Sequence, residues 1–196
     1  MKIYFIRHGE SEYNLAQRHS GWAQVELTEQ GKAQAESLRT YLSKIPFDKL
    51  YVSDLKRAIQ TSQLAIPGSN AEQTPLLREY STGKLAGNLF SECAERYGEA
   101  YKRARATLDY TPFDGENPDM IEKRAREFLD MVAATDYQTI AAFSHAGFLR
   151  TVAGCVLGMR LSPMKIRSAN CMVEIAEYVD GQWRLDSWIN PAELTR

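Results

Sequence analysis

Cysteine, long apolar runs and excess charge are all scarce in this chain. Its three cysteines, Cys93, Cys155 and Cys171, lie far apart and show neither a CxxC pair nor the His/Cys spacing of a zinc site. An odd number of scattered cysteines argues against a disulfide framework and favours free thiols in a reducing compartment. No run approaches the roughly 20 apolar residues of a membrane span, and the first residues lack the apolar core of a signal peptide. We therefore expect a cytoplasmic protein with no membrane partner.

The charges nearly balance, with 24 Lys and Arg against 25 Asp and Glu among 196 residues. No overall field then favours nucleic acid, which we do not expect as a partner. Internal repeats, linkers and low-complexity segments are missing too. With 44% hydrophobic and 25% charged residues, the composition is that of an ordinary globular protein. We expect a single domain over residues 1–196.

What the sequence does contain is an alternation of strand-like and helix-like segments. Residues 3–6 and 139–143 are near-continuously apolar, which is typical of parallel strands buried on both faces. Further strands are predicted at 49–53 and 73–78, and a hairpin at 171–178 and 182–189, joined by Asp180-Gly181. Helices are predicted over 27–45, 55–66, the later part of 83–110, 118–132 and 147–157, with Thr28, Asp54 and Asn117 as caps. This order predicts an α/β fold with a mostly parallel central sheet.

Charged and imidazole side chains stand where the predicted strands end. Arg7-His8 follows the first strand, and His145 follows the strand at 139–143. Arg57 lies in the first turn of the helix after the second strand, and Glu79 ends the third. Open α/β sheets bind ligands at this edge, so we expect these groups to form one site.

Two arginines, two histidines and one carboxylate, without metal-ligand spacing, suit a phosphate dianion. Guanidinium groups pair bidentately with phosphate oxygens and stabilise the charge that spreads over them during transfer. A neutral imidazole held in one tautomer can act as the nucleophile. A nearby carboxyl group can protonate the departing oxygen.

The motifs that carry a resemblance occur in order along most of the chain: Arg7-His8-Gly9-Glu10 with Asn14, Gly21-Trp22, Leu27-Thr28 with Gly31, Ser53-Asp54-Leu55-Lys56-Arg57-Ala58, Leu77-Arg78-Glu79 and Ser144-His145. This set resembles the histidine phosphatase superfamily, the phosphoglycerate-mutase-like group. The resemblance implies a three-layer α/β/α sandwich with no metal and no cofactor. It also implies site roles: His8 is phosphorylated, Glu79 donates the proton, Arg7, Arg57 and His145 bind the phosphoryl group, and Asn14, Ser20 and Gly21 contact the substrate.

Within that group the chain looks closest to the small phosphatases. The stretch between Glu79 and His145 is short and lacks an Arg-Arg pair for a substrate carboxylate, although Ala146 stands where the phosphatase branch usually has glycine. We therefore predict a metal-independent phosphoric monoester hydrolase of the histidine acid phosphatase type, acting on a small-molecule phosphate ester. A cofactor-dependent phosphoglycerate mutase and a non-catalytic phosphate-ligand sensor are the alternatives.

Residues 83–118 are expected to cover the substrate. Aromatic and basic side chains in or beside this segment would roof the site: Tyr80, Lys84, Phe90, Tyr97, Tyr110 and Phe113. They suggest an apolar or aromatic leaving group, with packing of the segment onto the body as the alternative. The basic run at 102–105 is expected to be a solvated helix face, and His19 an uninvolved surface residue.

Overall fold

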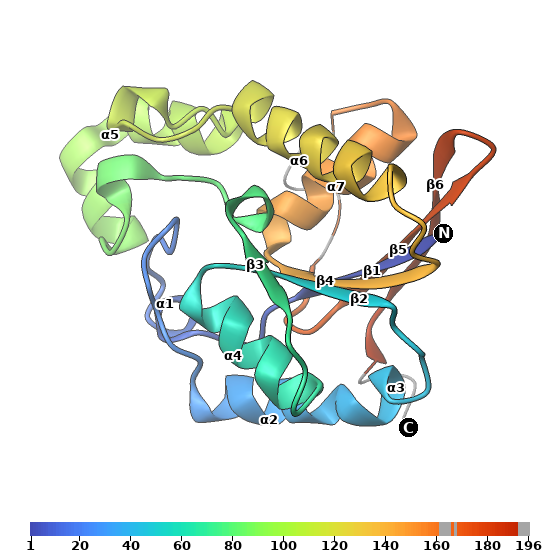
Figure 1. Cartoon of the computed structure of the whole chain (residues 1–196). Coiled ribbons are helices and arrows are strands. Elements are labelled where there is room, and N and C mark those ends of the chain that lie inside the picture. Colours follow the sequence, from blue (N-terminus) through green and yellow to red (C-terminus); the bar gives the residue numbers. More distant parts are fainter. Residues whose placement is uncertain (161–165, 167, 192–196) are drawn as a thin grey trace.

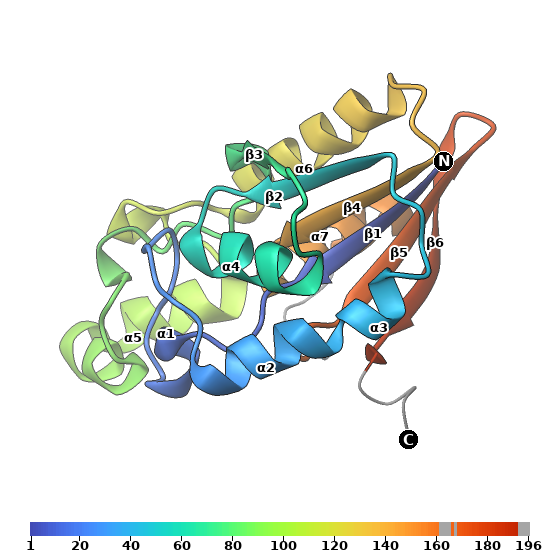
Figure 2. The same cartoon turned by 60° about the horizontal axis from the view of Figure 1, so that its bottom comes forward.

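A computed structural model describes residues 1–160, 166 and 168–191. One six-stranded sheet has the order β3-β2-β4-β1-β5-β6 (Figure 2). The strands are β1 (Lys2–Arg7), β2 (Lys49–Ser53), β3 (Glu72–Thr74), β4 (Thr139–Ser144), β5 (Val173–Val179) and β6 (Gln182–Ile189). β1 to β4 pair in parallel, whereas β5 and β6 are antiparallel to their neighbours. The prediction of a mostly parallel sheet is confirmed.

Helices cover both faces of the sheet (Figure 1). They are α2 (Glu29–Ser37), α3 (Arg39–Leu42) and α4 (Lys56–Ala65) on one face, and α6 (Pro118–Ala133) and α7 (Ala146–Leu157) on the other. In β1, Phe5 packs on the side of Phe128 and Phe148, while its neighbour Ile6 packs on the side of Leu38. Because successive strand residues face opposite ways and both sides are covered, the run at 3–6 is apolar throughout.

Several local predictions hold and others are wrong. Thr28 caps α2 and Asn117 caps α6, as expected. Asp54 does not cap α4, whose N-cap is Leu55. The Asp54 carboxylate instead takes a bidentate pair from Arg78, at 2.7 and 2.5 Å. Two charge-assisted hydrogen bonds from a guanidinium group stabilise the carboxylate more than one backbone N–H at the start of the helix would.

Two predicted elements are shorter than expected. The helix predicted over 27–45 breaks between α2 and α3. The strand predicted at 73–78 ends at Thr74, and Pro75 opens the 3₁₀ turn η1 (Pro75–Leu77), since proline has no N–H for the ladder. Glu79 therefore follows a turn and not a strand. The predicted hairpin is confirmed, with positive φ at both Asp180 (51°) and Gly181 (77°), as a type I′ turn requires.

The remaining elements lie beyond the carboxyl ends of β1 and β4 (Figure 1). They are α1 (Glu12–Leu15), η2 (Gly83–Leu85), α5 (Phe90–Thr107) and η3 (Thr111–Phe113). The segment that contains α5 has a small core of its own, which includes Leu85, Tyr101 and Phe113. Among the described helices, none has the length and apolar character needed to cross a membrane.

Candidate active site

Two histidines meet at the carboxyl edge of the sheet, as the sequence predicted. β1 runs parallel to β4 with Arg7 opposite Ser144, so the next residues, His8 and His145, lie side by side. Their ring centroids are 5.1 Å apart. The His8 backbone N–H continues the ladder by donating to the Ser144 carbonyl at 3.0 Å.

The surroundings of His8 fix its tautomer and its charge. Nδ1 lies 2.6 Å from the Gly9 carbonyl oxygen, which can only accept, so Nδ1 carries the proton. Nε2 is then unprotonated, and its lone pair accepts from Arg57 Nε at 3.3 Å. Burial, together with the charges of Arg57 and Arg7, holds the pKa of His8 well below its usual value. His8 is therefore a neutral imidazole with an available nitrogen, as a nucleophile must be.

Arg57 is fully buried in the first turn of α4. Its Nη1 donates to the Ala23 carbonyl at 3.0 Å and its Nη2 to the Gly21 carbonyl at 2.9 Å. Burial lowers the pKa of Arg57 to about 10, so it stays charged at neutral pH. The guanidinium thus ties the loop at residues 21–23 to His8 and places a positive charge beside it.

Arg7 and His145 each keep a buried nitrogen that has no partner among the described residues, Nε of Arg7 and Nδ1 of His145. Arg7 also donates through Nη1 to the Ser168 carbonyl. His145 is the N-cap residue of α7, and its Nε2 lies 2.9 Å from Ser53 Oγ. Burial and the charge of Arg57 lower the pKa of His145 well below its usual value. Unsatisfied buried polar groups are rare and costly, so this pair points to a ligand with several acceptor oxygens.

Backbone donors hold the carboxylate of Glu79. Oε1 accepts from the Tyr80 N–H at 3.0 Å, and Oε2 accepts from the Gly147 N–H at 3.1 Å. The Glu79 carbonyl accepts from Trp22 Nε1 at 2.8 Å. The side chain is therefore fixed from α7 and from its own turn, and it lies in the wall of a cavity.

Only glycine at position 147 leaves room for the Glu79 carboxylate in this position. A Cβ there would lie 2.2 Å from Glu79 Oε1 and 2.6 Å from Tyr80 Cδ2. The sequence predicts Glu79 as a proton donor, so we expect Gly147→Ala to displace its carboxylate and lower kcat on alkyl phosphates by about 30-fold, a partial loss of the roughly 10²–10⁴-fold that general acid catalysis supplies. Steady-state kinetics beside thermal unfolding would test this. An unchanged kcat in a folded variant would contradict it.

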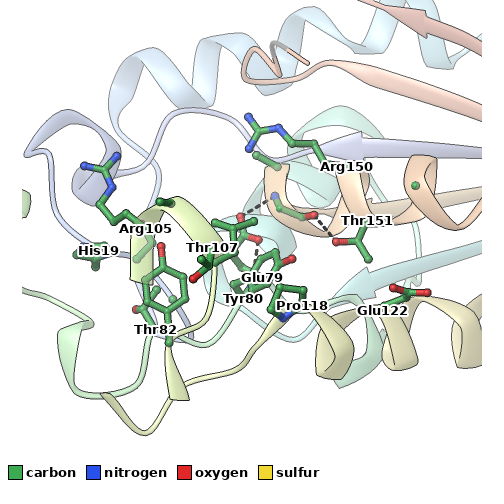
Figure 3. A pocket seen from close by; sticks show the side chains of 18 of the residues that line it. His19, Glu79, Tyr80, Thr82, Arg105, Thr107, Pro118, Glu122, Arg150 and Thr151 are labelled. Carbon is green, nitrogen blue, oxygen red and sulfur yellow. Dashed lines mark hydrogen bonds between the residues drawn. The ribbon is translucent and has the colours of Figure 1, made fainter. Parts of the chain in front are cut away.

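The cavity has a volume of about 540 Å³ and opens in front of Glu79 (Figure 3). His8, Arg57 and His145 are buried and do not belong to its wall. The three residues expected to contact substrate, Asn14, Ser20 and Gly21, do line it. Asn14 is also engaged locally, since its Oδ1 accepts from the Ser11 N–H at 3.2 Å and completes a capping box on α1. Gly21 has φ +43°, and a Cβ there would meet Thr82 Oγ1 at 2.5 Å.

Of the two surface predictions, the one for His19 is wrong and the one for the basic run holds. His19 is buried and lines the cavity, with Nε2 2.7 Å from the Tyr101 hydroxyl. The basic run is an exposed face of α5 as expected, with Lys102, Arg103 and Arg105 all exposed. Arg105 also borders the cavity, with its guanidinium carbon 5.1 Å from the centre of the Phe90 ring. The partners of His19 come from α5, far along the chain, so no local pattern marks this residue.

The aromatic roof divides into two groups. Tyr80, Phe90 and Tyr110 line the cavity. Tyr97 packs on Phe113 with ring centroids 5.0 Å apart. The sixth residue, Lys84, pairs with Asp114 at 3.4 Å. The alternative that these side chains only pack the segment therefore applies to part of the set.

The three buried histidines make stability depend on pH. Burial lowers the pKa of His19 to about 4, and the pKa values of His8 and His145 are also depressed. Below about pH 6.5 these histidines are protonated in the unfolded chain but remain neutral in the folded chain. The free energy of unfolding therefore falls as the pH drops. Each histidine contributes a slope of up to about 1.4 kcal/mol per pH unit.

Urea unfolding at pH 7.5 and 5.5 would measure this loss. Its matched control is His19→Gln, which removes one titrating group. Between pH 7.5 and 5.5, the free energy of unfolding of this variant should fall by about 1 kcal/mol less than that of the wild type. An identical loss in both proteins would contradict the assignment of a depressed pKa to His19.

The described residues contain no group of three or more His, Cys, Asp or Glu side chains placed to hold a metal ion. The positive charge beside His8 comes instead from Arg7 and Arg57, both of which lower the pKa of that histidine.

Comparisons with known proteins agree with this arrangement. A family model described as the histidine phosphatase superfamily (branch 1) matches residues 3–191. The adenosylcobalamin/alpha-ribazole phosphatase of Salmonella typhimurium is 32% identical over 165 residues, which cover 81% of each chain. The 2,3-bisphosphoglycerate-dependent phosphoglycerate mutase of Streptococcus thermophilus is 42% identical over 106 residues, which cover 50% of this chain and 46% of the mutase. A mutant phosphoserine phosphatase of Entamoeba histolytica, solved in complex with phosphoserine, has a TM-score of 0.82 and 28% identity over 98% of both chains.

Proposed function

Because the chain belongs to the histidine phosphatase superfamily, we propose that it is a metal-independent phosphomonoester hydrolase that acts through a phosphohistidine on His8. The observation that carries this proposal is the neutral His8 ring, with its Nε2 unprotonated, beside two guanidinium groups. A binding protein needs the positive charges but has no use for an activated imidazole next to them.

The reaction has two steps. First, His8 Nε2 attacks phosphorus in line and the P–O bond to the leaving group breaks. Glu79 gives its proton to the departing oxygen, which takes the electron pair. Arg7, Arg57 and His145 bind the phosphoryl oxygens, and their charge and hydrogen bonds stabilise the transition state. In the second step the Glu79 carboxylate takes a proton from water, the water oxygen attacks phosphorus, and the P–N bond breaks to return His8.

Hydrolysis is favoured over mutase chemistry by where the similarity lies. The phosphatase from Salmonella typhimurium matches over most of both chains, whereas the mutase matches over about half of each. A mutase must exclude water from its phosphohistidine and hold a second phosphate, which requires added structure around the site. The mutase stays the second candidate, because the half that matches is 42% identical.

The leaving group is proposed to be a bulky small molecule. A cavity of about 540 Å³ has the size of sites for drug-sized ligands, far larger than a glycerol or serine unit needs. Phe90, Leu108 and Tyr110 give one wall an apolar and aromatic character. We propose that residues 83–118 cover the substrate within one domain of residues 1–196. Alpha-ribazole phosphate, which the Salmonella typhimurium relative is named for, is a leading test substrate.

Phosphate release without added bisphosphate tests the activity. The panel is p-nitrophenyl phosphate, alpha-ribazole 5′-phosphate, phosphoserine and 3-phosphoglycerate, each with a chelator present. We expect phosphate release that the chelator does not affect. The highest kcat/KM is expected on alpha-ribazole 5′-phosphate, the bulkiest ester of the panel. Conversion of 3-phosphoglycerate to its isomer only when bisphosphate is added would favour the mutase. Tight phosphate-ester binding without turnover would favour the sensor.

A further inference from the structure

Arg124 of α6 holds the backbone that carries Glu79. Its side chain is 15% exposed. The two terminal nitrogens of its guanidinium group donate to three backbone carbonyls between Leu76 and Glu79. Nη1 donates to the carbonyls of Leu76 at 2.8 Å and Arg78 at 3.0 Å, and Nη2 donates to that of Glu79 at 3.2 Å. Arg124 is not in the cavity wall.

Glu116 balances the charge of this arginine and also hydrogen-bonds to the backbone of Ser81. Its side chain is 6% exposed, and Arg124 Nε and Nη2 each donate to its carboxylate at 2.9 Å. Glu116 Oε2 also accepts from the Ser81 N–H at 2.9 Å. The Glu116 backbone N–H donates to the Ser81 carbonyl at 2.9 Å. The proton-donor segment, residues 76–81, is therefore fixed on both sides of Glu79.

The segment needs this support because no sheet ladder reaches it. β3 ends at Thr74 and the single 3₁₀ turn η1 ends at Leu77, so the carbonyls of Leu76, Arg78 and Glu79 lie outside the sheet. The Glu79 carbonyl accepts from Trp22 Nε1 in addition to Arg124. Buried carbonyls require donors, and a five-donor guanidinium supplies several from one side chain. The bidentate carboxylate keeps the fork in one orientation.

We propose that Arg124, held by Glu116, is a positioning residue that keeps Glu79 where it protonates the leaving oxygen. The inference rests on the proposed function, since it assumes that Glu79 is the proton donor. Displacement of an acid by about 1 Å is enough to lose much of its contribution. The effect should therefore grow with the need of the leaving group for a proton.

The test compares two esters in Arg124→Met. On glycerol 2-phosphate, whose alkoxide needs a proton to leave, we expect kcat to fall by about 30-fold or more. On p-nitrophenyl phosphate, whose phenolate leaves without one, we expect a fall of less than about 3-fold. Arg124→Lys should recover part of the loss on the alkyl ester. Arg126→Met, on the exposed side of the same helix and paired with Glu122, is the matched control and should change neither rate.

A double-variant cycle separates positioning from general damage. Adding Arg124→Met to Glu79→Gln should cause little further loss on the alkyl ester, because the acid is already gone. Equal losses on both esters, or full additivity with Glu79→Gln, would overturn the proposal. Should Arg124→Met fail to fold because Glu116 is left as an unpaired buried charge, the variant Arg124→Met/Glu116→Met removes both charges and carries the same comparison. Wild-type protein that releases phosphate neither from these two esters nor from the substrate panel above would instead refute the proposed function.

Discussion

Replacing His8 with alanine is expected to abolish phosphate release, with kcat falling by about 10⁴-fold or more on every ester tested. The reason is that Nε2 of His8, left unprotonated by the Nδ1 contact with Gly9, has no substitute at the attacking position. The neighbouring imidazole is held differently, because His145 Nε2 lies against Ser53 Oγ. No described contact fixes the tautomer of His145 in the way that the Gly9 carbonyl fixes that of His8, so a second nucleophile of equal competence is not expected.

Two measurements would check this prediction. The first is steady-state phosphate release from the wild type and His8→Ala, with circular dichroism to show that both are folded. The second is rapid acid-free quenching with labelled substrate, in which the wild type should carry a base-stable, acid-labile phosphoryl group and the variant none. Labelling that persists in a folded His8→Ala variant would move the nucleophile to another residue.

Arg57→Met is expected to reduce kcat/KM by about 10³-fold, a loss of about 4 kcal/mol of transition-state stabilisation. Arg57 is the charge that contacts His8, and it is fully buried, so water does not replace it as a donor. The same change leaves the carbonyls of Gly21 and Ala23 without their donor, so a lower melting temperature should accompany the kinetic loss.

Conservative and neighbouring variants separate the two effects of Arg57. Arg57→Lys keeps the charge but loses the fork, so an intermediate activity is expected. Lys56→Met changes the adjacent residue of α4, which is exposed and pairs with Glu26, and should leave both activity and stability near the wild type. If Arg57→Lys retained full activity, the bidentate role of Arg57 would be wrong and only its charge would matter.

The elements that the sequence predicted well are those whose signal is local. Residues 3–6 and 139–143 are near-continuously apolar because helices cover both faces of the sheet, and this pattern is visible in a short window of sequence. The Asp180-Gly181 turn and the Asn117-Pro118 helix start depend on the backbone preferences of single residues. The prediction that Asp54 caps α4 was wrong because the side chain pairs with Arg78, which is distant in sequence and not visible in a local pattern.

Taken by itself, the sequence determined which strands carry His8 and His145 at their ends, because hydrophobic period and residue type at a strand exit are encoded within a few positions. The tertiary structure alone decided the charge and tautomer of His8, the burial of His19 and the Arg124 hold on Glu79. Each of these depends on burial or on contacts between distant segments. Desolvation and hydrogen-bond geometry act over a few ångströms in space, and no spacing along the chain reports them.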